Sequence, residues 1–373
     1  MTTPPTPTYA IVTGGGTAGH VLPAMAIADA MVAAGHPRAA MHYVGSERGI
    51  EARLVPATGY PMTLLPGRGI QRRVTLANVG AVWGLLVALG RAFRLVRQLR
   101  PKVVVAVGGY ASVAVALAAV MRRVPVIVAE QNVVPGLANR LMARFAKASA
   151  VSFAGTPLPR PVVTGNPIRS EITSIDPARN RADARAAFGV GEGRRLVLVF
   201  GGSLGALRIN RAVLQALPAW VDRSDLSVHH IVGARDWDLL QAEIPGDLGR
   251  LEYHPVLYED RMPAALAAAD VAVCRSGSST CFELAAVGLP AVLVPSPVVT
   301  ADQQTRNARQ LVDAGGAVLV PDAELDGPRL MLEVDALLTD PERWTVMSDA
   351  ARAWARPDAA AAIVELAARH ALA

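Results

Sequence analysis

Short apolar runs alternate with glycine turns and Ala-rich stretches along most of the chain. The run YAIVT at 9–13 leads through GGGTAGH at 14–20 into an apolar, Ala-rich stretch at 21–35, and similar units occupy 103–121 and 195–210. Continuous apolar strands followed by helical stretches are typical of parallel sheets covered by helices on both faces. The pattern therefore predicts an α/β protein.

The strand, glycine turn and helix unit occurs once near the start of each half of the chain. RLVLVF at 195–200 runs into GGSLGALRIN, as the first strand runs into GGGTAGH, which predicts two Rossmann-like domains. Between the halves, apolar periodicity gives way to prolines and charges near residues 165–170. We therefore predict domains at 8–167 and 168–356, with a last helix within 357–373 that packs back onto the first domain.

The first glycine turn is a candidate binding loop. Backbone N–H groups at a helix start attract anions and polar ligands, and glycines let a ligand approach closely. Gly14, Gly16 and Gly19 have the G-x-G-x-x-G spacing of dinucleotide sites, but the next strand ends at Gly45 without the acidic residue that such sites carry. His20, at the end of the turn, is either a structural residue or a proton-transfer group.

Composition excludes several classes of function. The chain has 373 residues, a formal charge of +6 and two cysteines, Cys274 and Cys281. Two cysteines make no disulfide framework and suit the cytoplasm, and no cluster has metal-ligand spacing. Asp236 and Asp238 have D-x-D spacing but fit a helix start better than a metal-diphosphate site. The sequence has no basic stripe with interleaved aromatic residues, so it does not indicate nucleic-acid binding.

An uncharged stretch between Arg73 and Arg91 is bordered by arginines on both sides. An apolar helix face with a basic border is how a peripheral protein lies on anionic lipid, although a buried helix with a solvated basic end gives the same pattern. The second uncharged run, 103–121, divides into strand, turn and helix, so we predict no membrane span. The candidate membrane face is Arg72, Arg73, Trp83, Leu86, Arg91 and Arg94.

The stretch CRSGSSTCFELAAVGLP, residues 274–290, is the most specific in the chain. Small hydroxyl residues open a predicted helix whose N-terminus suits a diphosphate. Glu283, one turn in, is placed to accept ribose hydroxyls. The alternative is a capping box, since Thr280 and Glu283 have S/T-x-x-E spacing.

Other polar side chains follow predicted strands. Gln303 and Gln304 carry amides that suit sugar hydroxyls, and Asn132 and Asn139 follow the strand at 124–129. Arg169, at the domain joint, can form a fork with phosphate oxygens.

Seven of these motifs together resemble one family. GGGTAGH, GGYAS, EQN, GNPIR, GGSLGA, CRSGSSTCFELAAVGLP and DQQTRNA occur in the order and approximate spacing of the MurG family of peptidoglycan N-acetylglucosaminyltransferases, from about Tyr9 to about Ala317. Ala18 and Leu204 stand where that family often has glycine and glutamine. The resemblance implies a GT-B fold, with two Rossmann-like domains facing across a cleft and a C-terminal helix returning to the N-terminal domain.

The resemblance also implies an activity. Such an enzyme moves N-acetylglucosamine from UDP-N-acetylglucosamine to the C4 hydroxyl of the muramoyl sugar of undecaprenyl-diphosphate-linked lipid I, with inversion, and gives lipid II. It implies His20 as the catalytic base, with acceptor binding as its alternative role. The implied donor residues are Arg169, Ser203, Glu259, Met262, Ser278, Ser279, Thr280, Glu283, Gln303 and Gln304. The implied acceptor-side residues are Thr17, Ala18, Gly19, Asn132 and Asn139.

The resemblance implies a peripheral location on the cytoplasmic face of the plasma membrane. The first domain would contact the anionic lipid surface. The resemblance implies no cofactor or strict metal requirement, and it allows partners among cell-wall synthesis and division proteins. Two other functions are compatible with the sequence: a UDP-N-acetylglucosamine 2-epimerase, which shares a GT-B-like fold, and a nucleotide-sugar-binding protein without turnover.

Overall fold

The computed structural model describes residues 7–66, 76–202 and 205–373. The chain divides into two compact units. Unit 1 comprises Met1–Arg169 and Arg356–Ala373, and unit 2 comprises Ser170–Ala355. Both are layered α/β structures, so the predicted fold class of two Rossmann-like domains is confirmed.

Unit 1 contains a parallel sheet whose described strands run in the order β3-β2-β1-β4-β5-β6-β7. The strands are β1 Ala10–Gly14, β2 Met41–Ser46, β3 Met62–Leu65, β4 Val103–Gly108, β5 Val126–Glu130, β6 Ala148–Val151 and β7 Pro161–Val163. The α-helices are α1 Ala18–Ala33, α2 Glu51–Leu54, α3 Leu76–Leu99, α4 Tyr110–Met121, α5 Leu137–Met142 and α15 Ala359–His370.

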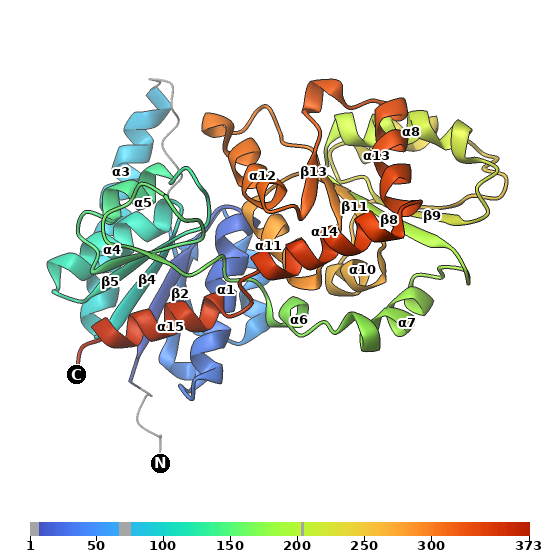
Figure 1. The fold of residues 1–373 in the computed structure, drawn as a ribbon. Helices are drawn as coiled ribbons and strands as arrows, with labels where there is room; N and C mark the ends of the chain where they lie inside the picture. Colours follow the sequence, from blue (N-terminus) through green and yellow to red (C-terminus); the bar gives the residue numbers. More distant parts are fainter. Residues whose placement is uncertain (1–6, 67–75, 203–204) are drawn as a thin grey trace, which may run out of the picture. The chain divides into compact units, whose positions relative to one another are not determined.

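Helices cover both faces of this sheet, which explains why its central strands β1, β4 and β5 are buried along their whole length. Side chains alternate between faces along a strand, so Val12 packs with α1 and α15, while Ile11 packs with α3, α4 and α5. The C-terminal helix α15 lies beside α1, as predicted (Figure 1). Ile363 and Ala367 of α15 are buried in the core of unit 1.

Unit 2 contains a second parallel sheet, with described strands in the order β10-β9-β8-β11-β12-β13. The strands are β8 Arg195–Phe200, β9 Leu226–Ile231, β10 Glu252–Val256, β11 Val271–Cys274, β12 Ala291–Leu293 and β13 Ala317–Leu319. The α-helices are α6 Ser170–Thr173, α7 Pro177–Ala187, α8 Leu207–Trp220, α9 Trp237–Leu240, α10 Met262–Ala268, α11 Ser278–Val287, α12 Gln303–Asp313, α13 Gly327–Leu338 and α14 Pro341–Trp354.

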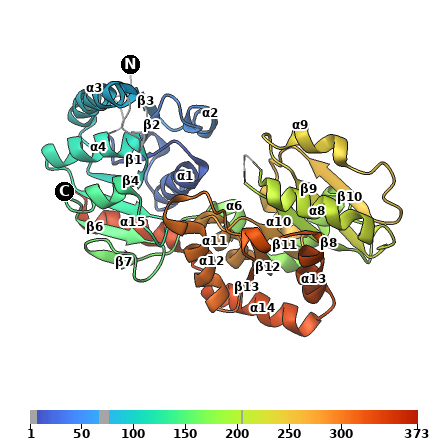
Figure 2. The same cartoon turned by 90° about the horizontal axis from the view of Figure 1, so that it is seen from above.

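The helices of unit 2 again lie in two layers. Helices α8 and α13 pack side by side on one face of the sheet, while α11 packs against α12 and α14 (Figures 1 and 2). At the carboxyl edge of this sheet, β8 is followed by the loop into α8, and β11 is followed by the loop into α11. In open α/β sheets ligands bind at this edge.

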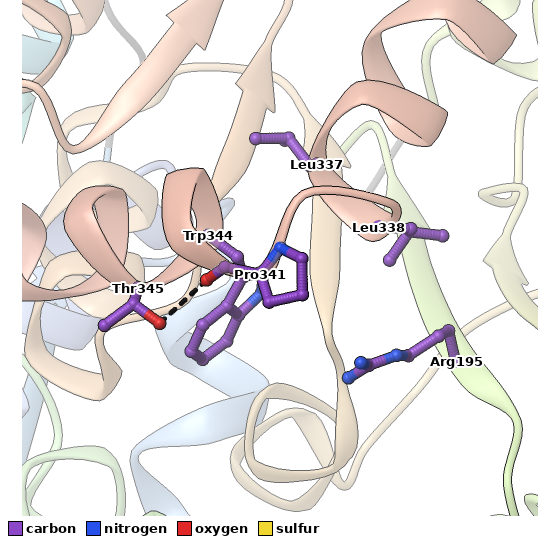
Figure 3. Close-up of a pocket in the computed structure, with 6 residues that line it drawn as sticks. All are labelled: Arg195, Leu337, Leu338, Pro341, Trp344 and Thr345. Carbon is purple, nitrogen blue, oxygen red and sulfur yellow. Dashed lines mark hydrogen bonds between the residues drawn. The ribbon is translucent and has the colours of Figure 1, made fainter.

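A buried carboxylate closes the opposite, amino edge of the unit 2 sheet. Asp270 accepts hydrogen bonds from Arg181 at 2.6 Å, from Arg185 and Arg195 at 3.0 Å, and from the backbone N–H of Leu196 at 2.7 Å. The Trp344 indole donates to the Asp270 carbonyl. Arg195 and Trp344 line a small pocket beside this cluster (Figure 3). The cluster ties α7 and α14 to β8 and β11.

We expect Asp270→Asn to destabilise unit 2 by about 2–4 kcal/mol, because removing one member of a buried ion cluster leaves its partners uncompensated. Urea unfolding followed by tryptophan fluorescence measures this loss. Asp225→Asn is the matched control, since Asp225 pairs with Arg223 but has a side chain that is 54% exposed. The control should lose less than about 1 kcal/mol. Equal losses in the two variants would contradict the assigned role of Asp270.

Candidate active site

The carboxyl ends of β1, β4 and β5 bring three predicted motifs together in unit 1. These strands are neighbours in the sheet and end at Gly14, Gly108 and Glu130. GGGTAGH therefore lies beside GGYAS, and GGYAS lies beside EQN. The sheet order, and not the sequence, makes these distant motifs adjacent.

The glycine loop is held by hydrogen bonds to its backbone on three sides. The Tyr43 hydroxyl donates to the Gly14 carbonyl at 2.6 Å, and the Gly15 N–H donates to the Gly108 carbonyl at 3.2 Å. The Gly16 N–H donates to the Glu51 carboxylate at 3.0 Å. These contacts fix the loop immediately before α1 begins.

His20 lies in the first turn of α1, with its ring over Gly108. A Cβ added to Gly108 would lie 2.8 Å from Cδ2 and 2.9 Å from Nε2 of His20. Gly108 also has a φ of +126°, which L side chains rarely adopt. The first glycine of GGYAS therefore makes room for the imidazole. His20 Nδ1 lies 3.4 Å from the Thr17 hydroxyl.

Burial lowers the pKa of His20 below its usual value. The negative charge of Glu130, a backbone hydrogen bond with Gly15 and the negative charge of Glu51 each oppose this shift. Because burial is the largest cause, the imidazole is neutral at pH 7. A neutral imidazole can accept a proton.

Glu130 organises the rest of this edge. Its carboxylate accepts hydrogen bonds from the backbone N–H of Asn132 at 2.9 Å, the N–H of Gly136 at 3.0 Å and the Asn139 amide at 2.9 Å. The Asn139 amide nitrogen also donates to the carbonyls of Val107 and Ala129, which joins β4 to β5. Asn139 is 2% exposed, so its position lies beneath the surface of the site.

The carboxyl edge of unit 2 carries the second group of predicted residues. Helix α11 begins at Ser278, after the N-cap residue Gly277. Thr280 therefore lies inside the first turn and does not cap the helix, so the capping-box alternative is wrong. Ser279, Thr280 and Glu283 are half-buried in this first turn and the next. The start of α11 thus offers hydroxyls and backbone N–H groups at the positive end of a helix dipole.

Gln304 connects the α11 turn to the loop before α12. Its backbone carbonyl accepts a hydrogen bond from the Ser276 hydroxyl at 3.0 Å, and its Oε1 accepts from the Ser296 N–H at 2.8 Å. The side-chain oxygen of Gln304 is therefore committed to the protein. Residues Ala301 and Asp302, just before Gln303, have φ values of 54° and 51°, in the left-handed region.

Glu259 is buried and shapes the turn before α10. Its carboxylate accepts from the backbone N–H of Arg261 at 2.8 Å and lies 3.2 Å from His229 Nε2. The Arg261 guanidinium also donates to it and stacks over Phe188. Met262 follows at the start of α10 and is half-buried.

A buried polar network supports the second glycine turn. Asn210, in α8, donates to the Val232 carbonyl at 2.9 Å and to Asp236 at 3.1 Å, and its Oδ1 lies 3.0 Å from His230 Nε2. Since the Asn210 oxygen can only accept, Nε2 of His230 carries the proton, and Nδ1 accepts from the Tyr253 hydroxyl at 2.8 Å. Burial lowers the pKa of His230 to about 3.

This network reaches the turn itself through the segment after β9. A Cβ on Gly205 would lie 2.3 Å from the Val232 carbonyl and 2.9 Å from Asp236. Arg235 donates to the Gly205 carbonyl at 3.3 Å. The neutral His230 thus helps to hold the loop between β8 and α8.

Comparisons with known proteins agree with this architecture. Residues 10–151 match the N-terminal domain of glycosyltransferase family 28, and residues 196–363 match its C-terminal domain. The chain is 42% identical over 363 residues to a UDP-N-acetylglucosamine–N-acetylmuramyl-(pentapeptide) pyrophosphoryl-undecaprenol N-acetylglucosamine transferase of Salinibacter ruber, covering 95% of each chain. It is 43% identical to the enzyme of that name from Frankia casuarinae, covering 95% of this chain and 94% of that one.

The chain belongs to the MurG family, within glycosyltransferase family 28. The crystal structure of Acinetobacter baumannii MurG superposes with a TM-score of 0.74 at 28% identity and covers 97% of this chain and 100% of that one. A UDP-N-acetylglucosamine 2-epimerase from Neisseria meningitidis superposes with a TM-score of 0.69 at 13% identity, covering 96% of this chain and 100% of that one. The second likeness shows the fold alone.

The sequence-predicted site residues of this MurG-family chain fall into two groups. Thr17, Ala18, Gly19 and His20 form the N-cap and first turn of α1 in unit 1, and Asn132 and Asn139 lie around Glu130 beside them. In unit 2, the residues from Ser278 to Glu283 and the glutamines lie at the same edge of the sheet, and Glu259 and Met262 lie at the start of α10. Arg169 is half-buried at the last position before unit 2. Ser203, Arg72 and Arg73 lie outside the described residues.

Sequence reasoning missed the residues that support these MurG-family motifs. The side chains of Glu51 and Ser112 form hydrogen bonds with backbone groups, which the sequence does not reveal. Asn210 and His230 lie in a helix and a strand whose sequence patterns are ordinary. The Ser112 hydroxyl lies 2.9 Å from the Thr13 carbonyl and 2.7 Å from the Gly108 carbonyl, which explains the serine of GGYAS. The sequence does carry one signal for Glu51: of the three glycines that surround its side chain, Gly45 and Gly49 precede it closely and Gly15 lies in the glycine loop.

We expect the stability of unit 2 to fall with pH below 6.5. Unfolded His230 takes up a proton near pH 6.5, whereas folded His230 takes one up only near pH 3. Between these values the unfolded state binds the extra proton, so His230 contributes a loss of about 1.4 kcal/mol per pH unit. Urea unfolding of wild type and His230→Gln between pH 4 and 7.5 measures the difference. The variant should show the shallower pH dependence, and identical slopes would refute the neutral, buried state of His230.

Proposed function

We infer that this chain transfers N-acetylglucosamine from UDP-N-acetylglucosamine to the C4 hydroxyl of the muramoyl sugar of lipid I, an undecaprenyl-diphosphate-linked acceptor. The likeness to relatives of that name across nearly the whole of both chains carries this inference. The site residues of unit 1 are proposed to serve the acceptor, and those of unit 2 the donor.

The chemical step is a single displacement at the anomeric carbon. The acceptor oxygen forms the new bond to that carbon, and UDP leaves with the electron pair of the bond that breaks. The proton of the attacking hydroxyl goes to His20, which is neutral because burial lowers its pKa. Thr17 and Gly19, both exposed at the start of α1, would contact the acceptor, and Asn132 would do so beside Glu130.

The departing diphosphate is proposed to bind at the start of α11. Ser278, Ser279 and Thr280 supply hydroxyls and backbone N–H groups at a helix N-terminus, where the dipole stabilises negative charge. Ser203 and Arg169 would add further donors. These groups stabilise the leaving group electrostatically, so we propose that no metal is required.

The remaining donor contacts are proposed for polar side chains at the carboxyl edge of the unit 2 sheet. Glu283 would accept the ribose hydroxyls, and Gln303 would bind the sugar hydroxyls. Gln304 has only its amide nitrogen available, since its oxygen bonds to Ser296. The Glu259 carboxylate is committed to Arg261, so the turn from Glu259 to Met262 would bind uracil through its backbone groups.

We expect His20→Ala to lower kcat by about 100-fold or more, the usual contribution of a general base. The assay follows transfer of labelled N-acetylglucosamine to a short-chain lipid I analogue in EDTA. His370→Ala, at the end of α15, is the control and should retain activity. Full activity of His20→Ala would remove His20 from catalysis. Loss of wild-type activity in EDTA, with recovery on adding Mg²⁺, would contradict the metal-free mechanism.

The acceptor carries a polyprenyl chain, so we propose that unit 1 docks on the inner leaflet of the membrane. No helix among the described residues is long and apolar enough to cross a membrane. Helix α3 buries Ala88, Ala92 and Val96 against α4 and leaves Leu86 57% exposed. Arg91 and Arg94 are exposed on the same helix. Trp83 also lies in α3, but its side chain is outside the described part.

A second exposed apolar stripe lies in the same layer of helices. Leu137 is 80% exposed, Leu141 38% and Phe145 53%, at four-residue spacing along α5 and the turn after it. Arg140 and Arg144 are exposed beside them. Apolar side chains with adjacent arginines can insert into the headgroup region of anionic lipid.

We expect Leu137→Asp with Phe145→Asp to weaken binding to vesicles of phosphatidylglycerol and phosphatidylcholine by about tenfold or more, because each aspartate removes apolar contact and adds repulsion. Co-sedimentation measures the bound fraction. Leu332→Asp, on α13 of unit 2 and 64% exposed in the native protein, is the matched control. Equal binding by the double variant and the control would exclude this stripe from the docking surface.

A further inference from the structure

Glu51 is a buried carboxylate beneath the glycine loop that the proposed mechanism does not use. It is the first residue of α2 and is 0% exposed. Its Oε1 accepts from the Ser46 N–H at 2.7 Å and from the Ser46 hydroxyl at 3.0 Å. Its Oε2 accepts from the Gly16 N–H at 3.0 Å. The side chain therefore joins the end of β2 to the loop between β1 and α1.

Three glycines form the space that this carboxylate occupies. A Cβ on Gly15 would lie 2.4 Å from Glu51 Oε1, a Cβ on Gly45 would lie 2.4 Å from its Cγ, and a Cβ on Gly49 would lie 1.9 Å from its Oε2. Contacts that short do not occur, so any larger residue at these positions would displace the carboxylate. The absence of a side chain at Gly45 and Gly49 therefore makes room for Glu51.

This arrangement distinguishes the loop from a phosphate-binding turn. A carboxylate that ends the second strand of a dinucleotide-binding unit faces the ribose. Glu51 instead faces the loop backbone and is closed off from solvent, so it cannot bind a ligand directly. It also occupies the Gly16 N–H and places a negative charge under the turn. Both effects disfavour an anion at this loop.

The contact with Gly16 lies just before the residues that we assign to the acceptor. Gly16 precedes Thr17, and the carbonyl of Thr17 accepts the His20 N–H at 3.1 Å as α1 begins. The position of Gly16 therefore sets where α1 starts and where the His20 ring lies over Gly108. We propose that Glu51 is a positioning residue for transfer, which fixes Gly16 and thereby aligns Thr17 and His20. This inference rests on the proposed function of the loop.

Glu51→Gln tests the role with little change of shape. If the amide keeps its oxygen toward the two Ser46 donors, its NH₂ faces the Gly16 N–H, and this one contact is lost. We expect kcat for transfer to fall about 10- to 100-fold, while KM for UDP-N-acetylglucosamine changes less than twofold. Glu47→Gln is the matched control, because it neutralises a half-exposed carboxylate in the same segment between β2 and α2, and it should leave both constants unchanged.

A double-mutant comparison tests whether Glu51 acts through His20. If it does, His20→Ala with Glu51→Gln is no slower than His20→Ala alone, because positioning has no value without the imidazole. Full multiplication of the two effects would overturn the proposal. A kcat for Glu51→Gln equal to that of wild type would overturn it as well.

The hydrogen-exchange rate of the Gly16 N–H, measured by NMR, tests the Glu51–Gly16 contact without an activity assay. It is measured on wild type, so it does not depend on whether Glu51→Gln folds. In wild type the Gly16 N–H should exchange as slowly as the amides within α1, and in Ser46→Ala, which keeps the Glu51–Gly16 contact, it should stay protected. Exchange of wild-type Gly16 at the rate of an open loop would overturn the contact. Absence of transfer by wild type with a protected Gly16 would contradict the proposed function but not the Glu51 anchor.

Discussion

Backbone N–H groups at the carboxyl edge of the unit 1 sheet are bonded to two buried carboxylates, and the geometry of the candidate acceptor site depends on this. Loops at this edge turn their N–H groups inward, where an unpaired donor costs about 1–3 kcal/mol. Glu51 accepts from Ser46 and Gly16, and Glu130 accepts from Asn132 and Gly136. Each carboxylate thus fixes one loop, and the negative charges of both act on His20, whose ring packs against Gly108.

The two carboxylates also set the electrostatics of His20. Burial lowers the pKa of the imidazole, whereas the two nearby negative charges oppose that change. Because burial is the larger effect, the pKa of His20 stays below its usual value and the ring is neutral at pH 7. Unit 2 supports its glycine turn with a different network, in which the neutral His230, Asn210 and Tyr253 are joined to the Asp236 carboxylate. The charge of Asp236 is paired with Arg235.

The fold and the main motifs could be predicted from the sequence because they follow from local patterns. Apolar runs of strand length, glycine turns and helix starts recur in order, and they place GGGTAGH and SGSST at the carboxyl ends of strands. The supporting residues could not be predicted in the same way. Gly16 and Glu51 are 35 positions apart, and their contact joins a side chain to a backbone group, which leaves no periodic signal.

The apolar stretch of α3 shows a different limit. Its composition fits both a core helix and a lipid-facing helix, and the described part shows that Ala88, Ala92 and Val96 face the core while Leu86 faces outward. Only tertiary packing divides the two faces. The stripe at Leu137 and Phe145 could not be predicted from the sequence, because α5 is too short to show a periodic pattern. The burial of Met142 and Ala143 in the structure identifies which side of α5 is exposed.

We propose that His20 accepts the proton of the attacking hydroxyl as a neutral imidazole. The decisive measurement is the pH dependence of kcat/KM for the lipid I analogue, made with wild type and with the residual activity of His20→Ala. If His20 is the base, wild type shows an acid limb with an apparent pKa below 6.5, and this limb is absent from the variant. The same limb in both proteins would show that another group takes the proton.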